Sequence, residues 1–289
     1  MPHLPIEIDD GIMLDTKAAR AYGATLSADY AAADPFPHTV VDGFLPPALI
    51  DKIVTNFPAR KVEGEELFEL GFVGHHKRQV PPAQCSGFNR TLFSFFNSAP
   101  VLGFLESVSG IKGLLPDPYF MGGGFHEISR GGHLGIHADF RLNKVLNLHR
   151  RLNMLIYLND GWQDEWGGHL ELWDRAMTRK VKSVAPLLNR CVIFNTDADS
   201  FHGHPDQLAC PPMVTRKSIA LYYYTASPNI TAEVPDMPTV YTHRPDDAVP
   251  KQRSLSLLLD RAMGDLLPPI AQRAIYRLRS KQRAKTKLA

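Results

Sequence analysis

The hydrophobic positions in the first part of the chain follow a helical period. The segment PPALIDKIVTNF carries apolar residues at helical spacing, and Pro46 and Pro47 can begin that helix. RTLFSFFNSAPVLGFLESVSG predicts a second helical zone, so we expect helical support over residues 46–115, with GHHKR (74–78) as a loop. Residues 1–35 show no clear period, and we expect an N-terminal extension there.

After residue 118 the pattern changes to short β-branched or aromatic segments separated by Gly, Asn, Asp and Pro. This pattern predicts an antiparallel sandwich or barrel over about 119–225. We therefore expect one domain over residues 36–225, mainly β with flanking helices. Residues 226–289 read as a Pro-rich loop followed by a basic helical tail.

RLNMLIYLND is the clearest strand, and its even-numbered positions from Leu152 onward form an apolar face. The opposite face is mixed. It carries Arg151, Asn153, Leu155 and Tyr157. This second face fits either the wall of a wet cavity or an ordinary solvent-exposed surface.

The composition and charge of the chain do not indicate a particular function. The formal net charge of the 289 residues is +2, so no nucleic-acid, membrane or acidic partner is indicated. The basic run from Arg273 to Lys287 favours a solvated tail, with a nucleic-acid or lipid-headgroup patch as the alternative. Three scattered cysteines indicate a reducing compartment, and neither a secretory signal nor an apolar run of about 18 residues occurs. We expect a soluble, cytoplasmic protein without a membrane span; its oligomeric state is not predicted.

The stretch HLGIHADF places His137 and Asp139 two positions apart. On a strand, side chains at this spacing point to the same face, so an imidazole and a carboxylate can reach one metal ion. Two histidines and one carboxylate with open coordination positions are typical of non-haem Fe(II) oxygenases. A third ligand must come from a distant strand folded back beside this one. The segment NTDADSFHGHPDQL offers His202 and His204.

Arg216 begins the strand RKSIALYYYT and shares one face with Ser218, Ala220 and Tyr222. A buried arginine at this position is costly unless an anion meets it. Its guanidinium group can bind a carboxylate through two hydrogen bonds. The pattern therefore indicates either a carboxylate ligand or an acidic partner residue.

Five blocks in a fixed order carry a resemblance to a known family: GGHLGIHADF, RLNMLIYLNDGW, GGHLELWD, CVIFNTDADSFHGHP and TRKSIALYYYT. Over roughly residues 120–225 the chain resembles the 2-oxoglutarate and Fe(II)-dependent oxygenases, in particular their prolyl 4-hydroxylase-like branch. PFPHTVVDGFLPPALI resembles the segment that precedes the core in bacterial members. The resemblance implies a double-stranded β-helix, the jelly-roll core that is also found in cupins.

The resemblance implies roles for the candidate metal ligands. His137 and Asp139 match the His-x-Asp ligands of the family. His202 matches the distal histidine better than His204 does, because the residues after it follow the family pattern. His133 is a further competitor, but it would reach the same face only with a changed local backbone.

The resemblance also implies a co-substrate site and a reaction. Arg216 matches the residue that pairs with the distal carboxylate of 2-oxoglutarate, Ser218 stands where a hydroxyl assists, and Tyr157 matches a tyrosine that contacts the same carboxylate. Fe(II), 2-oxoglutarate and O2 are implied, with ascorbate as a further candidate cofactor. The reaction hydroxylates an unactivated aliphatic C–H and converts 2-oxoglutarate to succinate and CO2. Because halogenating relatives lack the carboxylate ligand, Asp139 favours hydroxylation.

One departure and two rival readings remain. Relatives often carry a tyrosine where this chain has Glu127 and Ile128, so the resemblance does not extend to contacts on that side. The chain could be a catalytically silent jelly-roll binding protein, which the intact triad argues against. It could also be a cupin-like dioxygenase or metal-dependent isomerase that does not use 2-oxoglutarate, which Arg216 together with Tyr157 argues against. A small-molecule or peptidyl substrate is expected, and the fold does not choose between them.

Overall fold

A computed structural model gives the fold. It describes residues 3–59, 66–68, 73–226 and 238–247. The chain divides into two units, 1–245 and 246–289, and every element named below lies in the first. Within the described ranges, no helix has the length and apolar character that crossing a membrane requires.

The described residues form four α-helices, two short 3-10 helices and fifteen strands. The helices are α1 (Thr16–Ala32), α2 (Pro47–Thr55), η1 (Pro82–Gln84), α3 (Gly87–Phe96), α4 (Ala99–Ser109) and η2 (Asp164–Trp166). The strands up to β8 are β1 (Ile6–Ile8), β2 (Ile12–Leu14), β3 (His38–Val41), β4 (Glu66–Phe68), β5 (Gly74–Val80), β6 (Leu115–Pro116), β7 (Gly124–Ala138) and β8 (Leu142–Asn143). The remaining strands are β9 (Leu148–Tyr157), β10 (Leu170–Trp173), β11 (Lys180–Val184), β12 (Cys191–Asn195), β13 (His202–His204), β14 (Arg216–Thr225) and β15 (Val240–Tyr241).

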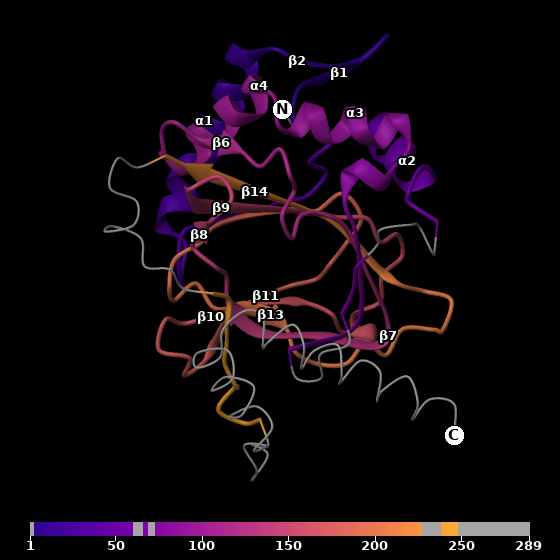
Figure 1. Cartoon of the computed structure of the whole chain (residues 1–289), viewed down its shortest axis with the longest axis vertical. Helices are drawn as coiled ribbons and strands as arrows, with labels where there is room; N and C mark the ends of the chain where they lie inside the picture. Colours follow the sequence, from indigo (N-terminus) through magenta and orange to yellow (C-terminus); the bar gives the residue numbers. More distant parts are fainter. Residues whose placement is uncertain (1–2, 60–65, 69–72, 227–237, 248–289) are drawn as a thin grey trace, which may run out of the picture. The chain divides into compact units, whose positions relative to one another are not determined.

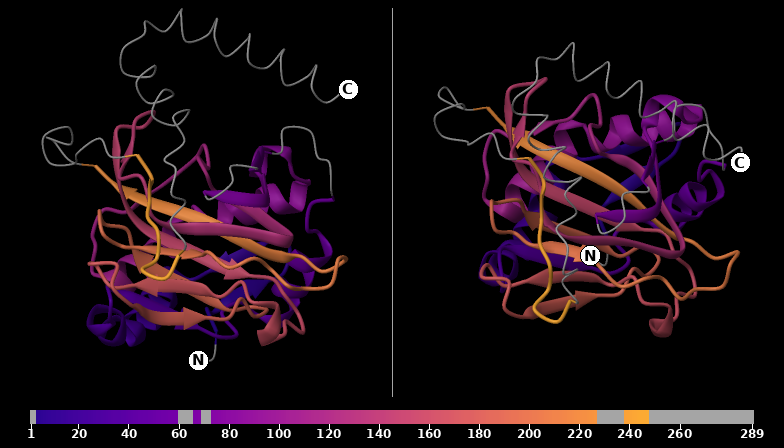
Figure 2. Two further views of the ribbon diagram at one scale, coloured as in Figure 1. Left: turned by 90° about the horizontal axis from the view of Figure 1, so that it is seen from below. Right: turned by 60° about the horizontal axis from the view of Figure 1, so that its bottom comes forward.

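Apart from the β1–β2 hairpin, the described strands belong to one antiparallel sheet whose main path is β11-β10-β13-β7-β14-β9-β12-β3. The sheet folds over itself: β9 and β14 lie on one side of the interior, and β10, β11 and β13 lie on the other (Figure 1). Two further views show the strands wrapping around this common interior (Figure 2). The predicted mainly β architecture with flanking helices is confirmed.

Strand β7 belongs to both sides of the folded sheet. Its first part pairs with β14, with Ile128 opposite Arg216, and its last part pairs with β13, with His137 opposite His202. The chain bends between these parts at Gly131, whose φ is +77°. At Gly132 a Cβ would lie 2.5 Å from Ile128 Cγ2, so a side chain has no room there. The two glycines of SRGGH therefore allow one strand to serve two layers.

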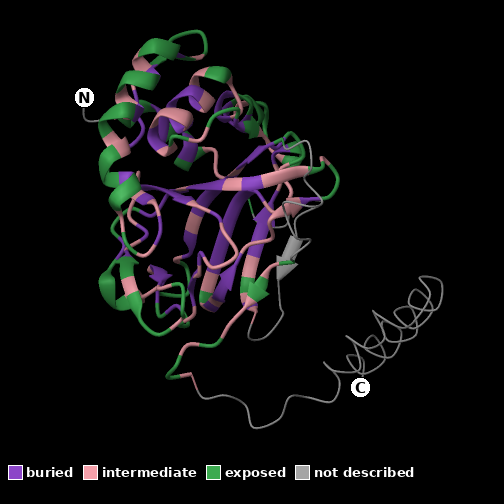
Figure 3. Cartoon of the chain, turned by 90° about the vertical axis from the view of Figure 1, so that its left-hand side faces the viewer, coloured by how far each residue is buried: buried purple, intermediate pink, exposed green. Residues whose placement is uncertain are grey.

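The helices cover the outer face of β9 and β14, as the alternation of apolar residues requires. The hydrophobic core joins residues of both strands to residues of α3 and α4; its members include Leu152, Met154, Ile156, Ile219, Leu221, Tyr223, Phe93, Phe96, Phe104 and Leu105. Figure 3 shows the buried strands beneath helices whose outer turns are exposed. The inner face is a cavity wall to which Asn153 and Leu155 contribute, so the cavity reading of this strand is correct.

Residues 1–35 are not a separate extension. They form β1, β2 and α1, and α1 packs along α4 within the same unit. The contact uses small residues: a Cβ on Gly23 would lie 2.5 Å from the Phe104 carbonyl oxygen. Because two of the three buried residues of α1 are Ala19 and Gly23, the helix shows little hydrophobic periodicity, and the sequence pattern did not reveal it.

Two further expectations need correction. GHHKR is not a loop but most of β5, which pairs with β7 so that Lys77 lies opposite Ile128. The predicted domain of residues 36–225 also extends beyond residue 225, since β15 pairs with β7, with Tyr241 opposite His137. Both segments carry polar side chains toward the interior, so neither shows an apolar strand face. The predicted basic tail lies outside the described residues.

Candidate active site

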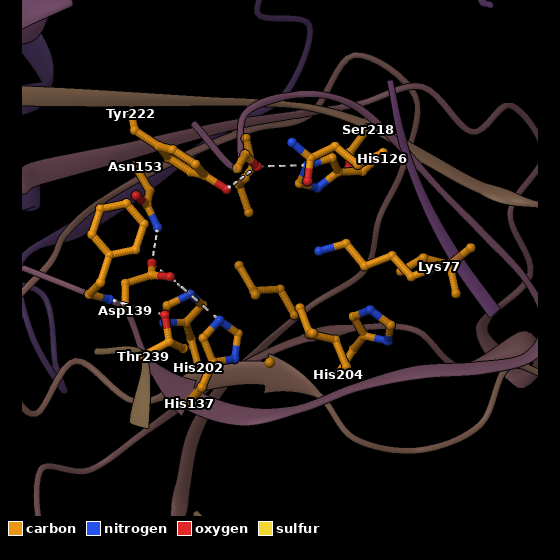
Figure 4. Close-up of a pocket in the computed structure, with 18 of the residues that line it drawn as sticks. Lys77, His126, His137, Asp139, Asn153, His202, His204, Ser218, Tyr222 and Thr239 are labelled. Carbon is orange, nitrogen blue, oxygen red and sulfur yellow. Dashed lines mark hydrogen bonds and ion pairs between the residues drawn. The ribbon is translucent and has the colours of Figure 1, made fainter. Parts of the chain in front are cut away.

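Three predicted ligands meet at one point inside the folded sheet. His137 lies in β7, Asp139 directly follows that strand, and His202 begins β13 opposite His137. Their ligand atoms all lie within 4.8 Å of one another. Asp139 Oδ1 is 3.7 Å from His137 Nε2, and Asp139 Oδ2 is 3.5 Å from His202 Nε2 (Figure 4). The register of β7 and β13 thus brings distant parts of the sequence to one centre.

Backbone hydrogen bonds fix both imidazole rings in the ligating orientation. His137 Nδ1–H donates to the carbonyl oxygen of Gly135 at 2.8 Å, and His202 Nδ1–H donates to that of Ser200 at 2.9 Å. The Nε2 atoms, which carry the free lone pairs, therefore face the centre. Burial lowers the pKa of His137 to about 3 and also lowers the pKa of His202. Both rings are neutral near pH 7, which is the form that binds metals.

The carboxylate of Asp139 is ionised despite its burial. Burial raises its pKa, but the neighbouring Arg150 guanidinium, aided by the two imidazoles and Asn153, holds the pKa well below its ordinary value. Two neutral imidazoles and one carboxylate are the donor set of the facial triad that binds non-haem Fe(II). These residues fit that metal by type, protonation and spacing.

The competing histidines His204 and His133 do not belong to this cluster of ligand atoms. His204 is 3% exposed and lines the same cavity, but it is not one of the three clustered ligands. Neither of its ring nitrogens has a hydrogen-bond partner within the described part of the chain. His133 lies beside His75, at the point where β5 pairs with β7. The geometry therefore assembles His202 rather than either competitor.

A cavity of about 190 Å³ extends from the triad between the two layers of the sheet. Arg216 and Ser218 line it from β14, and Lys77 and Gln79 line it from β5. Figure 4 shows the triad on one side of this space and Lys77, His204 and Ser218 around the other. The predicted co-substrate residues on β14 thus share a cavity with the predicted metal ligands.

Arg216 is buried and is held by neutral oxygen atoms. Its Nε donates to the carbonyl oxygen of Gly168 at 2.7 Å, and its Nη2 donates to the Tyr157 hydroxyl at 3.2 Å. Gly168 has φ +72°, and a Cβ there would lie 3.0 Å from Arg216 Cδ. Tyr157 is fully buried, and its hydroxyl contacts Arg216, which lines the cavity. Tyr157 therefore orients the guanidinium group.

Sequence reasoning missed several cavity residues, of which Arg150 is the most informative. Strict alternation along β9 assigns Arg150 to the apolar face of Leu152 and Arg151 to the mixed face. The structure shows the reverse, because the register with β14 shifts so that Leu152 pairs with Tyr223 and Arg150 pairs with Tyr224. This bulge turns Arg150 into the cavity. No local pattern in the sequence marks such a bulge.

Other missed residues come from segments outside the predicted core. Lys77 and Gln79 lie on β5, and Thr239 and Tyr241 belong to the segment that contains β15. The Tyr241 ring stacks on His137 with centroids 5.1 Å apart. The run of polar residues in β5 was the available signal, since a strand that faces a wet cavity need not alternate.

Comparisons with known proteins show what the region around this site resembles. Residues 123–224 match the family model described as the 2OG-Fe(II) oxygenase superfamily. No match was found among the curated proteins. A prolyl hydroxylase from Trichoplax adhaerens, solved with a hypoxia-inducible-factor peptide, has 15% identity and a TM-score of 0.51, covering 72% of this chain and 91% of its own. The epimerase SnoN, solved with Fe3+, α-ketoglutarate and nogalamycin RO, has 16% identity and a TM-score of 0.50, covering 81% and 94%.

Residues 123–224 therefore match a 2OG-Fe(II) oxygenase domain. At the identities above, the solved structures establish a shared fold, which confirms the predicted jelly-roll core. The enzyme class is that of the 2-oxoglutarate-dependent dioxygenases, which use Fe(II), 2-oxoglutarate and O2. The silent binding protein and the cupin-like alternative are not favoured, because the family match and the clustered triad agree.

Proposed function

We propose that this enzyme hydroxylates an unactivated aliphatic carbon of a small-molecule or peptidyl substrate and couples this step to decarboxylation of 2-oxoglutarate to succinate and CO2. One observation carries the proposal: His137, Asp139 and His202 converge at a cavity that also contains a buried arginine. The presence of Asp139 supports hydroxylation, because a carboxylate occupies the position that halogenating relatives leave for halide.

His137, Asp139 and His202 would hold Fe(II), which when bound supplies the activation of dioxygen. The chain contributes preorganisation. The Gly135 and Ser200 carbonyl oxygens fix the imidazole rings, and burial keeps the rings neutral.

Arg216 would bind the distal carboxylate of 2-oxoglutarate. Its bonds to Gly168 and Tyr157 use two of the five guanidinium N–H groups, so donors remain for an anion. Ser218 lines the same wall from β14. His204 has two unpartnered ring nitrogens among the described residues and is suited to add a hydrogen bond at this end. An anion here would complete the pairing of the buried charge.

Two lesser expectations stay proposals. The three cysteines are free, which supports a cytoplasmic site of action. Use of ascorbate would follow from the family resemblance and would be visible as increased turnover when ascorbate is added.

A spectroscopic and product assay tests the proposed function. Anaerobic addition of Fe(II) and then 2-oxoglutarate should produce a weak visible charge-transfer band, and admission of oxygen should yield succinate. His137→Ala should abolish the band. Incubation with a metabolite extract should identify the compound whose mass increases by one oxygen. An identical spectrum in wild type and His137→Ala would overturn the ligand assignment, and the absence of succinate would overturn the reaction.

A further inference from the structure

The metal-ligand candidate Asp139 is held from behind by a buried arginine. Arg150 is 1% exposed, and its Nη2 lies 3.0 Å from Asp139 Oδ2. Aromatic rings flank the guanidinium group: its carbon lies 3.6 Å from the ring centre of Tyr222 and 4.7 Å from that of Phe140. Stacking and charge pairing leave this side chain little freedom to move.

Asn153 joins the arginine to the carboxylate. Its Oδ1 accepts from Arg150 Nη2 at 2.7 Å and from Arg150 Nε at 3.1 Å. Its Nδ2 donates to Asp139 Oδ2 at 2.7 Å. The three side chains therefore close a triangle in which the amide has a fixed orientation, and Figure 4 shows Asn153 directed at Asp139.

Stability alone does not account for this arrangement. Burying an ion pair costs desolvation energy, and apolar residues of similar volume are often equally good or better for folding. Strand β9 also carries a bulge that turns Arg150 away from the face of Leu152 and into the cavity. The bulge directs the charge toward one carboxylate, which indicates a role at the site.

The hydrogen-bond geometry distinguishes the two carboxylate oxygens. Asn153 Nδ2 donates a hydrogen bond to Oδ2, and Arg150 Nη2 lies 3.0 Å from the same oxygen as its ion-pair partner. Oδ2 also lies 3.5 Å from His202 Nε2, but Oδ1, 3.7 Å from His137 Nε2, has neither of these two partners and is therefore the oxygen better suited to bind a metal ion. A carboxylate that can use only one oxygen leaves more coordination positions open for other ligands.

We propose that Arg150 and Asn153 are positioning residues that restrict Asp139 to one ligating oxygen. Arg150 also balances the carboxylate charge, so the donor set together with Arg150 carries no net charge. A bound dication then keeps its full attraction for an anionic co-substrate. This inference rests on the proposed function, because it requires the triad to bind metal.

Co(II) is a suitable probe, because its visible spectrum reports both binding and coordination. Anaerobic titrations would compare wild type with Arg150→Met, Arg150→Lys and Asn153→Leu. The matched control is Arg151→Met, which removes the adjacent arginine, whose Nη1 contacts Thr225 Oγ1 at 3.4 Å rather than Asp139. We expect Arg150→Met and Asn153→Leu to weaken Co(II) binding by about 10–100-fold and to change the visible band, as loss of partners behind a ligand does.

Arg150→Lys should restore part of the affinity, because it keeps the charge but loses the two-pronged contact with Asn153. Arg151→Met should match wild type. If Arg150→Met fails to fold, Asn153→Leu decides, since it retains the ion pair between Arg150 and Asp139. Variants that lose thermal stability but keep wild-type Co(II) affinity and spectrum would overturn the proposal. Failure of wild type to bind Co(II) would instead overturn the proposed function.

Discussion

The buried charges at the two ends of the cavity differ in whether a protein group of opposite charge pairs with them. At the triad, the Asp139 carboxylate is balanced inside the protein by Arg150. At the other end, Arg216 is bonded to the neutral oxygens of Gly168 and Tyr157, and no carboxylate pairs with it among the residues that the structure describes. The charge at the triad is thus balanced within the protein, whereas the proposed 2-oxoglutarate carboxylate would supply the counter-charge at Arg216. The predictions below separate these two ends.

The largest expected effect concerns the choice of histidine. Removing a residue that hydrogen-bonds to a metal ligand typically weakens metal binding by about 10–100-fold. His202→Ala should weaken Fe(II) or Co(II) binding by a larger factor, because it removes a ligand itself. His204→Ala is the matched control, since that residue stands two positions away on the same strand. Anaerobic metal titration of both variants is the measurement. A reversed result would move the distal ligand to His204.

The folding stability of the metal-free protein should fall at acid pH, because buried histidines line the cavity at both of its ends. Burial lowers the pKa of His126, His137, His202 and His204, so the unfolded chain binds more protons than the folded one below the ordinary histidine pKa of about 6.5. Stability is then fully present above that pH and is lost as the pH falls through it.

Each such histidine should cost the metal-free protein about 1.4 kcal/mol of unfolding free energy per pH unit below about 6.5. Urea unfolding at pH 7, 6 and 5 measures the slope. His126→Gln should reduce the slope by one proton. An unfolding free energy that stays constant or increases toward acid pH would show that these rings are protonated in the folded protein.

Arg216→Met tests the proposed 2-oxoglutarate site at the end of the cavity where no carboxylate of the described residues pairs with the arginine. We expect the KM for 2-oxoglutarate to rise by about 10–100-fold, since hydrogen bonds to charged groups contribute about 1.5–3 kcal/mol. Metal affinity should change little, because the triad does not contact Arg216. Lys217→Met, at the next position of β14, serves as the control. Unchanged co-substrate affinity in Arg216→Met would place the carboxylate anchor elsewhere.

The smallest effect is expected from Gly168→Ala. The added Cβ would lie 3.0 Å from Arg216 Cδ and 2.6 Å from Leu208 Cδ2, so the guanidinium group should shift and the KM for 2-oxoglutarate should rise a few fold. The backbone strain should cost about 1–3 kcal/mol of stability. Gly161→Ala separates the two causes, because Gly161 has φ +58° but no atom within 4 Å of its added Cβ. An equal KM in Gly168→Ala and wild type would show that Arg216 does not depend on this contact.

Much of the site could be predicted from local patterns. Alternation places His137 with Asp139 and Arg216 with Ser218, and in the structure all four side chains line the same cavity, although Asp139 directly follows β7 rather than belonging to it. The strand from Leu148 to Tyr157 was also recognisable, because its apolar face is regular. These placements agree with the structure because each depends on residues only a few positions apart. The roles assigned to the metal ligands and to the co-substrate residues stay predictions: His137, Asp139, His202, Arg216, Ser218 and Tyr157.

By itself, the sequence determined the fold class and the residue types of the candidate metal site, because strand alternation is a local property and the five ordered blocks resemble a known family. The family resemblance already favoured His202 over His204, but only the tertiary structure shows His202 beside His137 and Asp139, and only it shows Arg150 beside Asp139. The first depends on the register of β13 against β7, and the second on a bulge in β9. Lys77 and Tyr241 likewise enter the site through strand pairing. Such pairings depend on the packing of distant segments, which no local period encodes.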